Sequence, residues 1–183
     1  MPTVFSHSLV GVVFGKFFAK RTGLKFWTLT ILCAIFPDFD VITRFFGIPL
    51  WHMLGHRGVF HSILFVTIVA FVVVTAGYRE IKRFSKEWWS FFVYFLLIGL
   101  SHIILDTFTS GGMGVGLLMP FDSTRYLSPY RPIRISPSRL ITFFESTGAR
   151  IAVSELIWIW IPSVAALIIL WFIKRRKSKK GIY

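Results

Sequence analysis

The sequence predicts an all-α protein, a polytopic membrane bundle with about five membrane-embedded helices. Its 183 residues are 55% hydrophobic and 18% aromatic, and the mean hydropathy is +0.68. The hydrophobic share exceeds the usual apolar content of soluble domains. Several apolar stretches approach the roughly 20 residues that a helix needs to cross a bilayer. Most of the basic residues behind the net charge of +13 lie between or after these stretches. We interpret them as topology signals and expect no nucleic-acid partner.

The first two apolar segments each depart from an ideal span. Val4–Phe18 is short and carries His7, so tilting or burial within the bundle must make up its length. Leu24–Ile42 is apolar up to Pro37, after which the sequence continues as "PDFDV". Because proline disrupts helical hydrogen bonding, Pro37 permits an irregular backbone at the end of this second helix.

The last three apolar segments are typical membrane helices. Val59–Gly77 is almost entirely aliphatic and aromatic, and Trp88–Phe108 is equally apolar until His102 and Asp106 near its end. Ile151–Ile173 carries several tryptophans, which suit a membrane interface or helix packing. Together the five segments predict one membrane-embedded helical domain over residues 1–173, followed by a basic cytoplasmic tail over residues 174–183.

The basic residues predict the orientation of these helices. Of the 21 lysines and arginines, 14 lie in the connection between spans one and two, in the connection between spans three and four, or after span five. The positive-inside rule places this side in the cytoplasm, so the C-terminus is expected inside and the N-terminus outside a bacterial or archaeal inner membrane. The basic residues on the other side are all arginines: Arg44, Arg57, Arg125, Arg131, Arg134, Arg139 and Arg150.

Histidines and aspartates from four separate segments are expected to meet at the outer end of the bundle. Burying such side chains without partners is costly, so their convergence indicates a function. Neutral imidazole and carboxylate are the usual ligands of zinc and also suit manganese or iron. A purely structural role, as a polar contact or helix cap, is the alternative for any single member. The candidate metal ligands are His7, Asp38, Asp40, His56, His61, His102 and Asp106.

The spacing within these segments separates strong from weaker ligand pairs. In "HIILD", His102 and Asp106 are four residues apart, so both side chains share one helical face. In "HRGVFH", the five-residue spacing of His56 and His61 does not suit one face. We therefore expect His56 in a loop and His61 in the first turn of the following helix.

The "PDFD" motif leaves two arrangements open. On a regular α-helix Asp38 and Asp40 point about 200° apart, so both can bind one metal site only if the backbone is irregular. Otherwise one of them is a ligand and the other orients a histidine ligand.

Arginine is well suited to hold a phosphate, because its planar guanidinium forms paired hydrogen bonds. Arg57 is the first candidate, since His56 and His61 flank it, and we expect Arg57 and Asp40 to be catalytic. The alternatives are pairing with Asp122, Glu145 or Glu155, or with lipid head groups. The role of the 122–150 segment stays open. The Gly-rich segment before it is either a loop that contacts substrate or a flexible connector. The other candidate substrate-binding arginines are Arg125, Arg131 and Arg134.

The motifs taken together resemble a known family. His7, "PDFD", "HRGVFHS", "SHIILDTFT" and "LLMPF" occur in the order typical of the YdjM-like family of inner-membrane proteins, over about residues 7–121. Members of that family are described as LexA-regulated or membrane-bound metal-dependent hydrolases. The family is similar, more distantly, to zinc-dependent phospholipase C and the S1/P1 nucleases.

This resemblance implies metal roles for five positions. They are His7, Asp38 or Asp40, His61, His102 and Asp106, with Asp106 as a bridging carboxylate. The soluble enzymes carry a further HxxxE pair, which this sequence lacks, and an N-terminal amine ligand, which Met1 is not expected to supply. We expect about two ions, zinc first and manganese or iron as alternatives.

The expected function is metal-dependent hydrolysis of a phosphoester, such as a lipid phosphate or phospholipid at the outer membrane face. A bound metal lowers the pKa of water towards ~7, and arginine offsets charge in the transition state. Membrane lipids are the expected partners, and the oligomeric state is open. A metal-ion transporter is one alternative, although such sites usually lie mid-membrane between repeats. A non-catalytic scaffold with a closed metal site is another.

Overall fold

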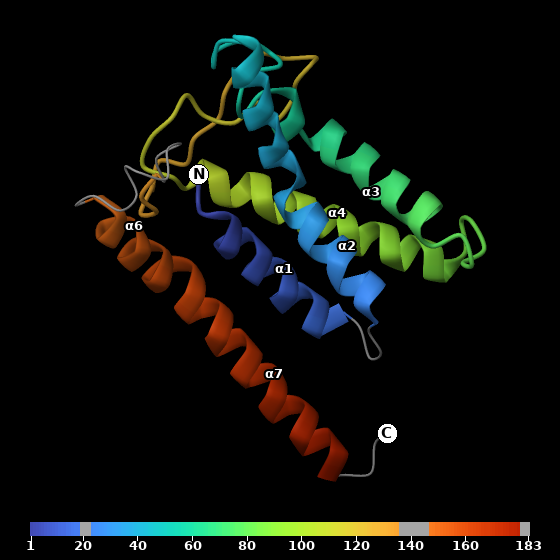
Figure 1. Ribbon diagram of the computed structural model, residues 1–183. Helices are drawn as coiled ribbons and strands as arrows, with labels where there is room; N and C mark the ends of the chain where they lie inside the picture. Colours follow the sequence, from blue (N-terminus) through green and yellow to red (C-terminus); the bar gives the residue numbers. More distant parts are fainter. Residues whose placement is uncertain (19–22, 136–146, 180–183) are drawn as a thin grey trace.

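The computed structural model describes residues 1–18, 23–135 and 147–179, which form helices joined by loops without an extended strand (Figure 1). This arrangement confirms the predicted all-α bundle. The α-helices are α1 (Val4–Phe18), α2 (Leu24–Ile35), α3 (Ile63–Gly77), α4 (Lys86–Thr107), α6 (Thr147–Glu155) and α7 (Ile161–Lys179).

Three helical stretches are long and apolar enough to cross a membrane: Leu24–Phe46, Lys86–Thr107 and Gly148–Arg176. Helices α1 and α3 are also apolar but have only 15 residues each, which corresponds to ~22 Å at 1.5 Å per residue. A hydrocarbon core of ~30 Å therefore exceeds their length. All five predicted segments are helical, and only their ends differ from the expectation.

The ends differ where local chemistry changes the helix. The second helix continues past its predicted end as a 3₁₀-helix, η1 (Phe36–Phe46). The third begins at Ile63, because the Ser62 hydroxyl caps it and accepts a hydrogen bond from the Phe65 amide at 3.1 Å. In the fifth, a π-helical turn, η3 (Leu156–Trp160), joins α6 to α7, which continues into the predicted tail.

Helix α4 lies at the centre of the bundle, in contact with α1, α2 and α3. Phe26, Val74, Trp88 and Phe95 are buried in the core between these helices. A Cβ atom on Gly99 would lie 2.8 Å from the Cβ of Val66, so glycine is what allows α3 and α4 to approach this closely.

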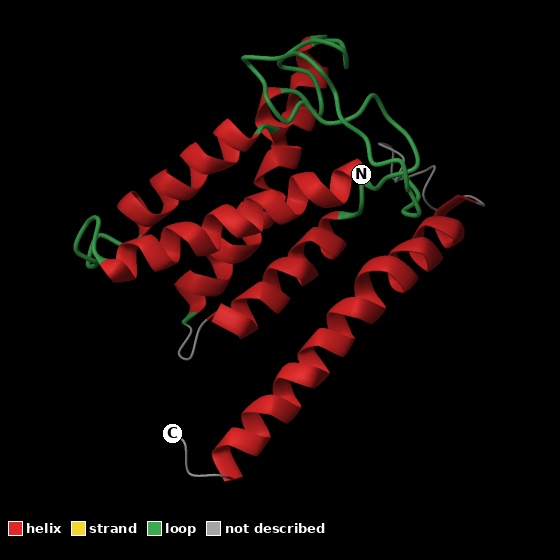
Figure 2. Cartoon of the chain, turned by 180° about the vertical axis from the view of Figure 1, so that it is seen from behind, coloured by secondary structure: helices red, strands yellow, loops and turns green. Residues whose placement is uncertain are grey.

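Helix α7 packs along α1 and is otherwise little covered. Figure 2 shows it set apart from the other helices, and only 11% of an 18-residue apolar stretch within Gly148–Arg176 is buried. An apolar helix with so little protein contact suits a lipid environment.

Glu155, at the end of α6, makes several polar contacts with the first helix and is buried at the start of α1. Its carboxylate accepts hydrogen bonds from the Thr3 amide at 2.6 Å, the Thr3 hydroxyl at 2.6 Å and the Ser6 hydroxyl at 2.5 Å. The Trp160 indole also donates to Ser6, at 2.9 Å. A carboxylate at a helix N-terminus satisfies free amides and complements the helix dipole. Glu155 therefore anchors the last helix to the first.

Replacing this anchor should destabilise the protein measurably. We expect Glu155→Ala to lower the free energy of unfolding by about 2–3 kcal/mol, since it removes hydrogen bonds to a charged, buried group. Unfolding in detergent by circular dichroism measures the change. Glu80→Ala is the matched control, because Glu80 pairs with Lys25 on the surface and should contribute nothing measurable. Equal effects of the two variants would contradict the anchoring role.

Candidate metal centre

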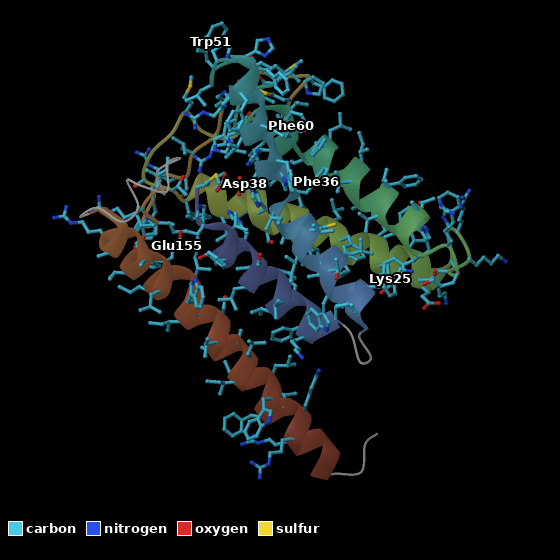
Figure 3. The ribbon with its side chains drawn as sticks, viewed as in Figure 1. Lys25, Phe36, Asp38, Trp51, Phe60 and Glu155 are labelled. Atoms are coloured by element: carbon cyan, nitrogen blue, oxygen red, sulfur yellow. The ribbon has the colours of Figure 1, made fainter. Side chains whose placement is uncertain are left out.

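Four buried side chains meet where the loop-bearing end of the bundle begins. Asp38, His61, His102 and Asp106 each offer one ligand atom, and these atoms all lie within 4.8 Å of one another. Asp38 Oδ1 is 3.5 Å from Nε2 of both His61 and His102, and Asp106 Oδ2 is 3.4 Å from His61 Nε2. Figure 3 shows Asp38 near the end of α4, at the opposite end of the bundle from Lys25.

Three different local structures deliver these side chains. His102 and Asp106 project from one face of α4, as their four-residue spacing predicts. His61 lies in a short 3₁₀ turn, η2 (Val59–His61), directly before α3 and close to its predicted place in the first helical turn. Asp38 comes from η1, where the chain continues α2 in tighter 3₁₀ form.

The 3₁₀ geometry also decides between the two arrangements of "PDFD". At three residues per turn, Asp38 and Asp40 point about 240° apart. Asp38 faces the cluster, whereas Asp40 lies behind His61, with its Oδ2 at 2.9 Å from His61 Nδ1. The described geometry is the second arrangement, in which one aspartate is a candidate ligand and the other orients a histidine.

Contacts with neighbouring oxygen atoms orient the two central histidines. His102 Nδ1 lies 2.7 Å from the carbonyl oxygen of Ala34, which can only accept, so Nδ1 carries the proton. His61 Nδ1 lies 2.9 Å from Asp40 Oδ2 without hydrogen-bond geometry, and the negative charge of that carboxylate favours a proton on Nδ1. Both rings therefore direct an Nε2 lone pair into the cluster, and the two Nε2 atoms lie 3.2 Å apart. Histidine ligands of metals are commonly held in this way.

The cluster has the unsatisfied polar atoms that a cation would satisfy. Both carboxylate oxygens of Asp38 and of Asp106 are buried without a hydrogen-bond partner, as are both ring nitrogens of His7. With neutral histidines, Asp38, Asp40 and Asp106 against Arg57 leave a net charge of −2. Buried carboxylates and lone pairs at these separations repel one another unless a positive charge lies between them. The residues therefore fit a divalent metal ion.

His7 lies beside this group, on the far side of Asp106. Its ring stacks on His102 with centroids 3.8 Å apart, and its Nε2 is 3.7 Å from Asp106 Oδ1. Asp106 thus directs Oδ1 to His7 and Oδ2 to His61, the geometry of a carboxylate that can bridge two ions. Burial lowers the pKa of the Met1 α-amino group to about 6, and the charge of Asp106 opposes that shift.

Arg57 is buried with its guanidinium against Asp106 rather than open to solvent. Its Nε lies 3.0 Å from Asp106 Oδ2, Nη2 donates to the Thr109 hydroxyl at 2.9 Å, and Nη1 donates to the Gly111 carbonyl at 3.2 Å. Its backbone amide donates to Asp40 Oδ2 at 2.9 Å, and its φ of 65° lies in the left-handed region. Such a φ is costly for a residue other than glycine, so these contacts hold it in place.

His56 is a loop residue, as expected, and it contacts Asp40. Its Nδ1 lies 2.6 Å from Asp40 Oδ1, so Asp40, His56 and His61 form a second group that could hold an ion. A neutral His61 has one lone pair, and the first cluster already uses it. In the described arrangement, His56 and Asp40 therefore support His61 from behind.

The Gly-rich segment after α4 packs against the histidine loop. The Gly116 amide donates to the Arg57 carbonyl at 2.9 Å, and the Ile63 amide donates to the Leu117 carbonyl at 3.0 Å. Gly58 is required within that loop, because a Cβ there would collide with the Met53 carbonyl oxygen. Through these contacts the Gly-rich segment holds the loop that carries Arg57 and His61 in position.

The other candidate arginines lie outside the cluster among the described residues. Arg125 donates to the carbonyls of His56, Gly114, Leu50 and His52, so it ties loops together. Arg131 is exposed, and the amide of exposed Arg134 donates to Ser154 at 3.0 Å. Their binding of substrate stays a prediction. Arg139 and Glu145 fall outside the described residues.

The sequence pattern missed some contacts that orient the cluster. Thr109 holds Arg57, and its hydroxyl also lies 2.8 Å from the Asp106 carbonyl. The Ala34 carbonyl holds His102. A carbonyl has no side-chain signature, and Thr109 could have been suspected only from its place three residues after Asp106.

The role of Asp40 gives a graded prediction. We expect Asp40→Asn to weaken metal affinity roughly 10–100-fold without abolishing binding, because the partner that orients His61 is altered while the ligands remain. Competition against a chromophoric chelator measures the affinity. Asp122→Asn, in an exposed loop turn, is the control and should leave it unchanged. Complete loss of binding in Asp40→Asn would instead make Asp40 a direct ligand.

Comparison with known proteins gives consistent matches over nearly the whole chain. A family model described as "YdjM inner membrane protein" matches residues 1–177. Inner membrane protein YbcI of Escherichia coli (strain K12) is 32% identical over 176 residues, which cover 96% of this chain and 100% of that protein. No solved structure matches the chain.

Proposed function

The chain belongs to the YdjM inner membrane protein family, and on this premise we propose that it is a membrane-bound, metal-dependent hydrolase acting on phosphoesters. The observation that supports the proposal is the buried cluster of Asp38, His61, His102 and Asp106, whose ligand atoms converge and whose carboxylates are only partly offset by Arg57. Imidazole and carboxylate ligands with an accessible position are typical of hydrolytic metal sites.

Each residue would have a distinct part in this reaction. A divalent ion held there would supply a Lewis acid and lower the pKa of a bound water towards ~7. Asp38 is 8% exposed, more than any other member of the cluster, so substrate and water would enter on its side. Arg57 would keep Asp106 ionised and positioned, and Asp40 would hold the proton on His61 Nδ1.

We expect about two ions, with zinc first and manganese or iron as alternatives. The two oxygens of Asp106 face different histidines, which supports a bridging role between one ion near His61 and another near His7. The distribution of lysine and arginine supports an outer location for this site, with a cytoplasmic C-terminus. An outer-leaflet lipid phosphate or phospholipid is then a substrate that need not leave the membrane.

Phosphate release from lipids tests the proposal. Purified protein loaded with zinc or manganese is incubated with phosphatidic acid, phospholipids and soluble phosphoesters in mixed micelles. We expect the wild type and Asp122→Asn to release phosphate or a phosphorylated head group, and Asp38→Asn to be at least ~100-fold slower, since it removes a charged ligand.

A second candidate is a non-catalytic protein stabilised by its metal. It is favoured by the near-complete burial of the cluster and by the internal partners of Arg57. In that case the wild type binds metal and gains thermal stability from it, but releases no more product than Asp38→Asn from any substrate. That result would overturn the hydrolase proposal.

A further inference from the structure

An apolar groove runs along the flank of the bundle between α2, η1 and α3, with a volume of about 670 Å³. Leu29, Leu32, Ile68, Val72 and Val73 line it within the helices, and aromatic side chains line the end nearer the metal centre. Figure 3 labels two of these aromatics, Phe36 and Phe60, on the same flank. From Phe65 to Val73 the α3 wall alone extends for ~12 Å, at 1.5 Å per residue.

The groove walls are side chains that the bundle leaves uncovered. Ile68 and Val72 on α3 are 51% and 53% exposed, and Phe39 and Ile42 on η1 are 54% and 56% exposed. They belong to helices whose apolar character suits the bilayer interior, so hydrocarbon rather than water surrounds them. A groove at this depth is filled by hydrocarbon chains or by another protein.

One end of the groove lies next to the metal centre, at a residue that contacts one of its histidines. Asp40 and Thr43 line its upper end, and the Thr43 hydroxyl donates to the Asp40 carbonyl at 2.7 Å. Asp40 in turn contacts His61, one of the four central ligand candidates. Phe36 stacks on Phe65, and Phe60 packs edge-on against Phe65, so aromatic rings line the groove on the side of this end.

We propose that this α2–α3 groove binds the acyl chain of the lipid whose phosphate is cleaved at the metal centre. The inference rests on the proposed function and narrows its substrate to long-chain lipid phosphoesters. The position of the groove next to the metal centre supports this proposal. An acyl chain lying in the groove has its polar end beside Asp40, where the polar cluster begins. A second protein chain in the groove would have no reason to end at that point.

A cavity-filling variant tests the groove. Val72→Trp fills it far from the metal centre, and Val164→Trp on α7 is the matched control, at similar exposure (53% and 47%) on a surface outside the groove. We expect Val72→Trp to lower kcat/KM for dioleoyl phosphatidic acid roughly tenfold, because each excluded methylene loses binding energy. Turnover of dihexanoyl phosphatidic acid should stay within about twofold, and Val164→Trp should resemble the wild type for both.

Photocrosslinking reports on the groove without requiring turnover. Phosphatidic acid with a diazirine near the end of its acyl chain, in phosphatidylcholine vesicles, should label the 68–73 and 29–33 segments in the wild type and label Val72→Trp less. Labelling there without hydrolysis of any substrate would defeat the proposed function, while binding of an acyl chain in the groove would still stand. Uniform labelling of all helices, equal loss with both chain lengths, or crosslinks that place a second protein chain in the groove would overturn it.

Discussion

Asp106→Ala and His61→Ala should purify without the transition metal that we expect the wild type to carry, and this is the largest effect we expect. Each variant removes a ligand candidate from the centre of the cluster, and Asp106 also contributes charge that attracts a dication. A site that loses one of four ligands and part of its charge binds far more weakly. Mass spectrometry of detergent-purified protein, with about two equivalents expected in the wild type, measures the loss.

Controls exist within the same chain. Asp122→Ala removes an exposed loop carboxylate, and His52→Ala removes an exposed histidine whose Nδ1 accepts a hydrogen bond from the Leu54 amide. Both should keep the full metal content. If the wild type binds no metal even after reconstitution with zinc or manganese, the hydrolase proposal fails, and the clustered histidines require explanation as packing or ion-transport groups. If His52→Ala also loses metal, binding is not confined to the cluster.

The parts of this site that sequence could predict are those fixed by local periodicity. The bounds of α1 coincide with the predicted Val4–Phe18 segment, and His102 and Asp106 share a face because a regular helix turns 3.6 residues at a time. The grouping of seven ionisable residues at one end followed from the alternation of apolar and basic segments. Each of these inferences needs only neighbours in the chain.

The remaining features depend on contacts between distant segments. Which aspartate of "PDFD" faces the cluster depends on how η1 packs against His61 and His102, and the helical period alone does not determine that. Arg57 looked like a phosphate ligand because histidines flank it, but its guanidinium lies against Asp106, from α4. The carbonyl that orients His102 comes from α2. Such partners become apparent only once the helices are packed together.

Arg57→Ala should be the most destabilising single change that leaves the four ligand candidates in place. Arg57 is 2% exposed and its partner Asp106 is fully buried, so the variant leaves a buried carboxylate without its counter-charge. Breaking a buried ion pair in this way costs about 3–5 kcal/mol. Unfolding of the metal-free protein in detergent measures the cost, and bound metal should recover part of it by replacing the missing positive charge.

A double variant separates this pairing from substrate binding. If Arg57 serves Asp106, then Arg57→Ala with Asp106→Asn should be more stable than Arg57→Ala alone, because the uncompensated charge is also removed. If Arg57→Ala unfolds like the wild type, keeps its metal and only loses turnover, the guanidinium is free to bind phosphate, as the flanking histidines first suggested. The two outcomes differ because Asp106, Thr109 and Gly111 each contact a different nitrogen of the guanidinium and hold it in place. A phosphate would have to bind the two remaining N–H groups or displace part of that network.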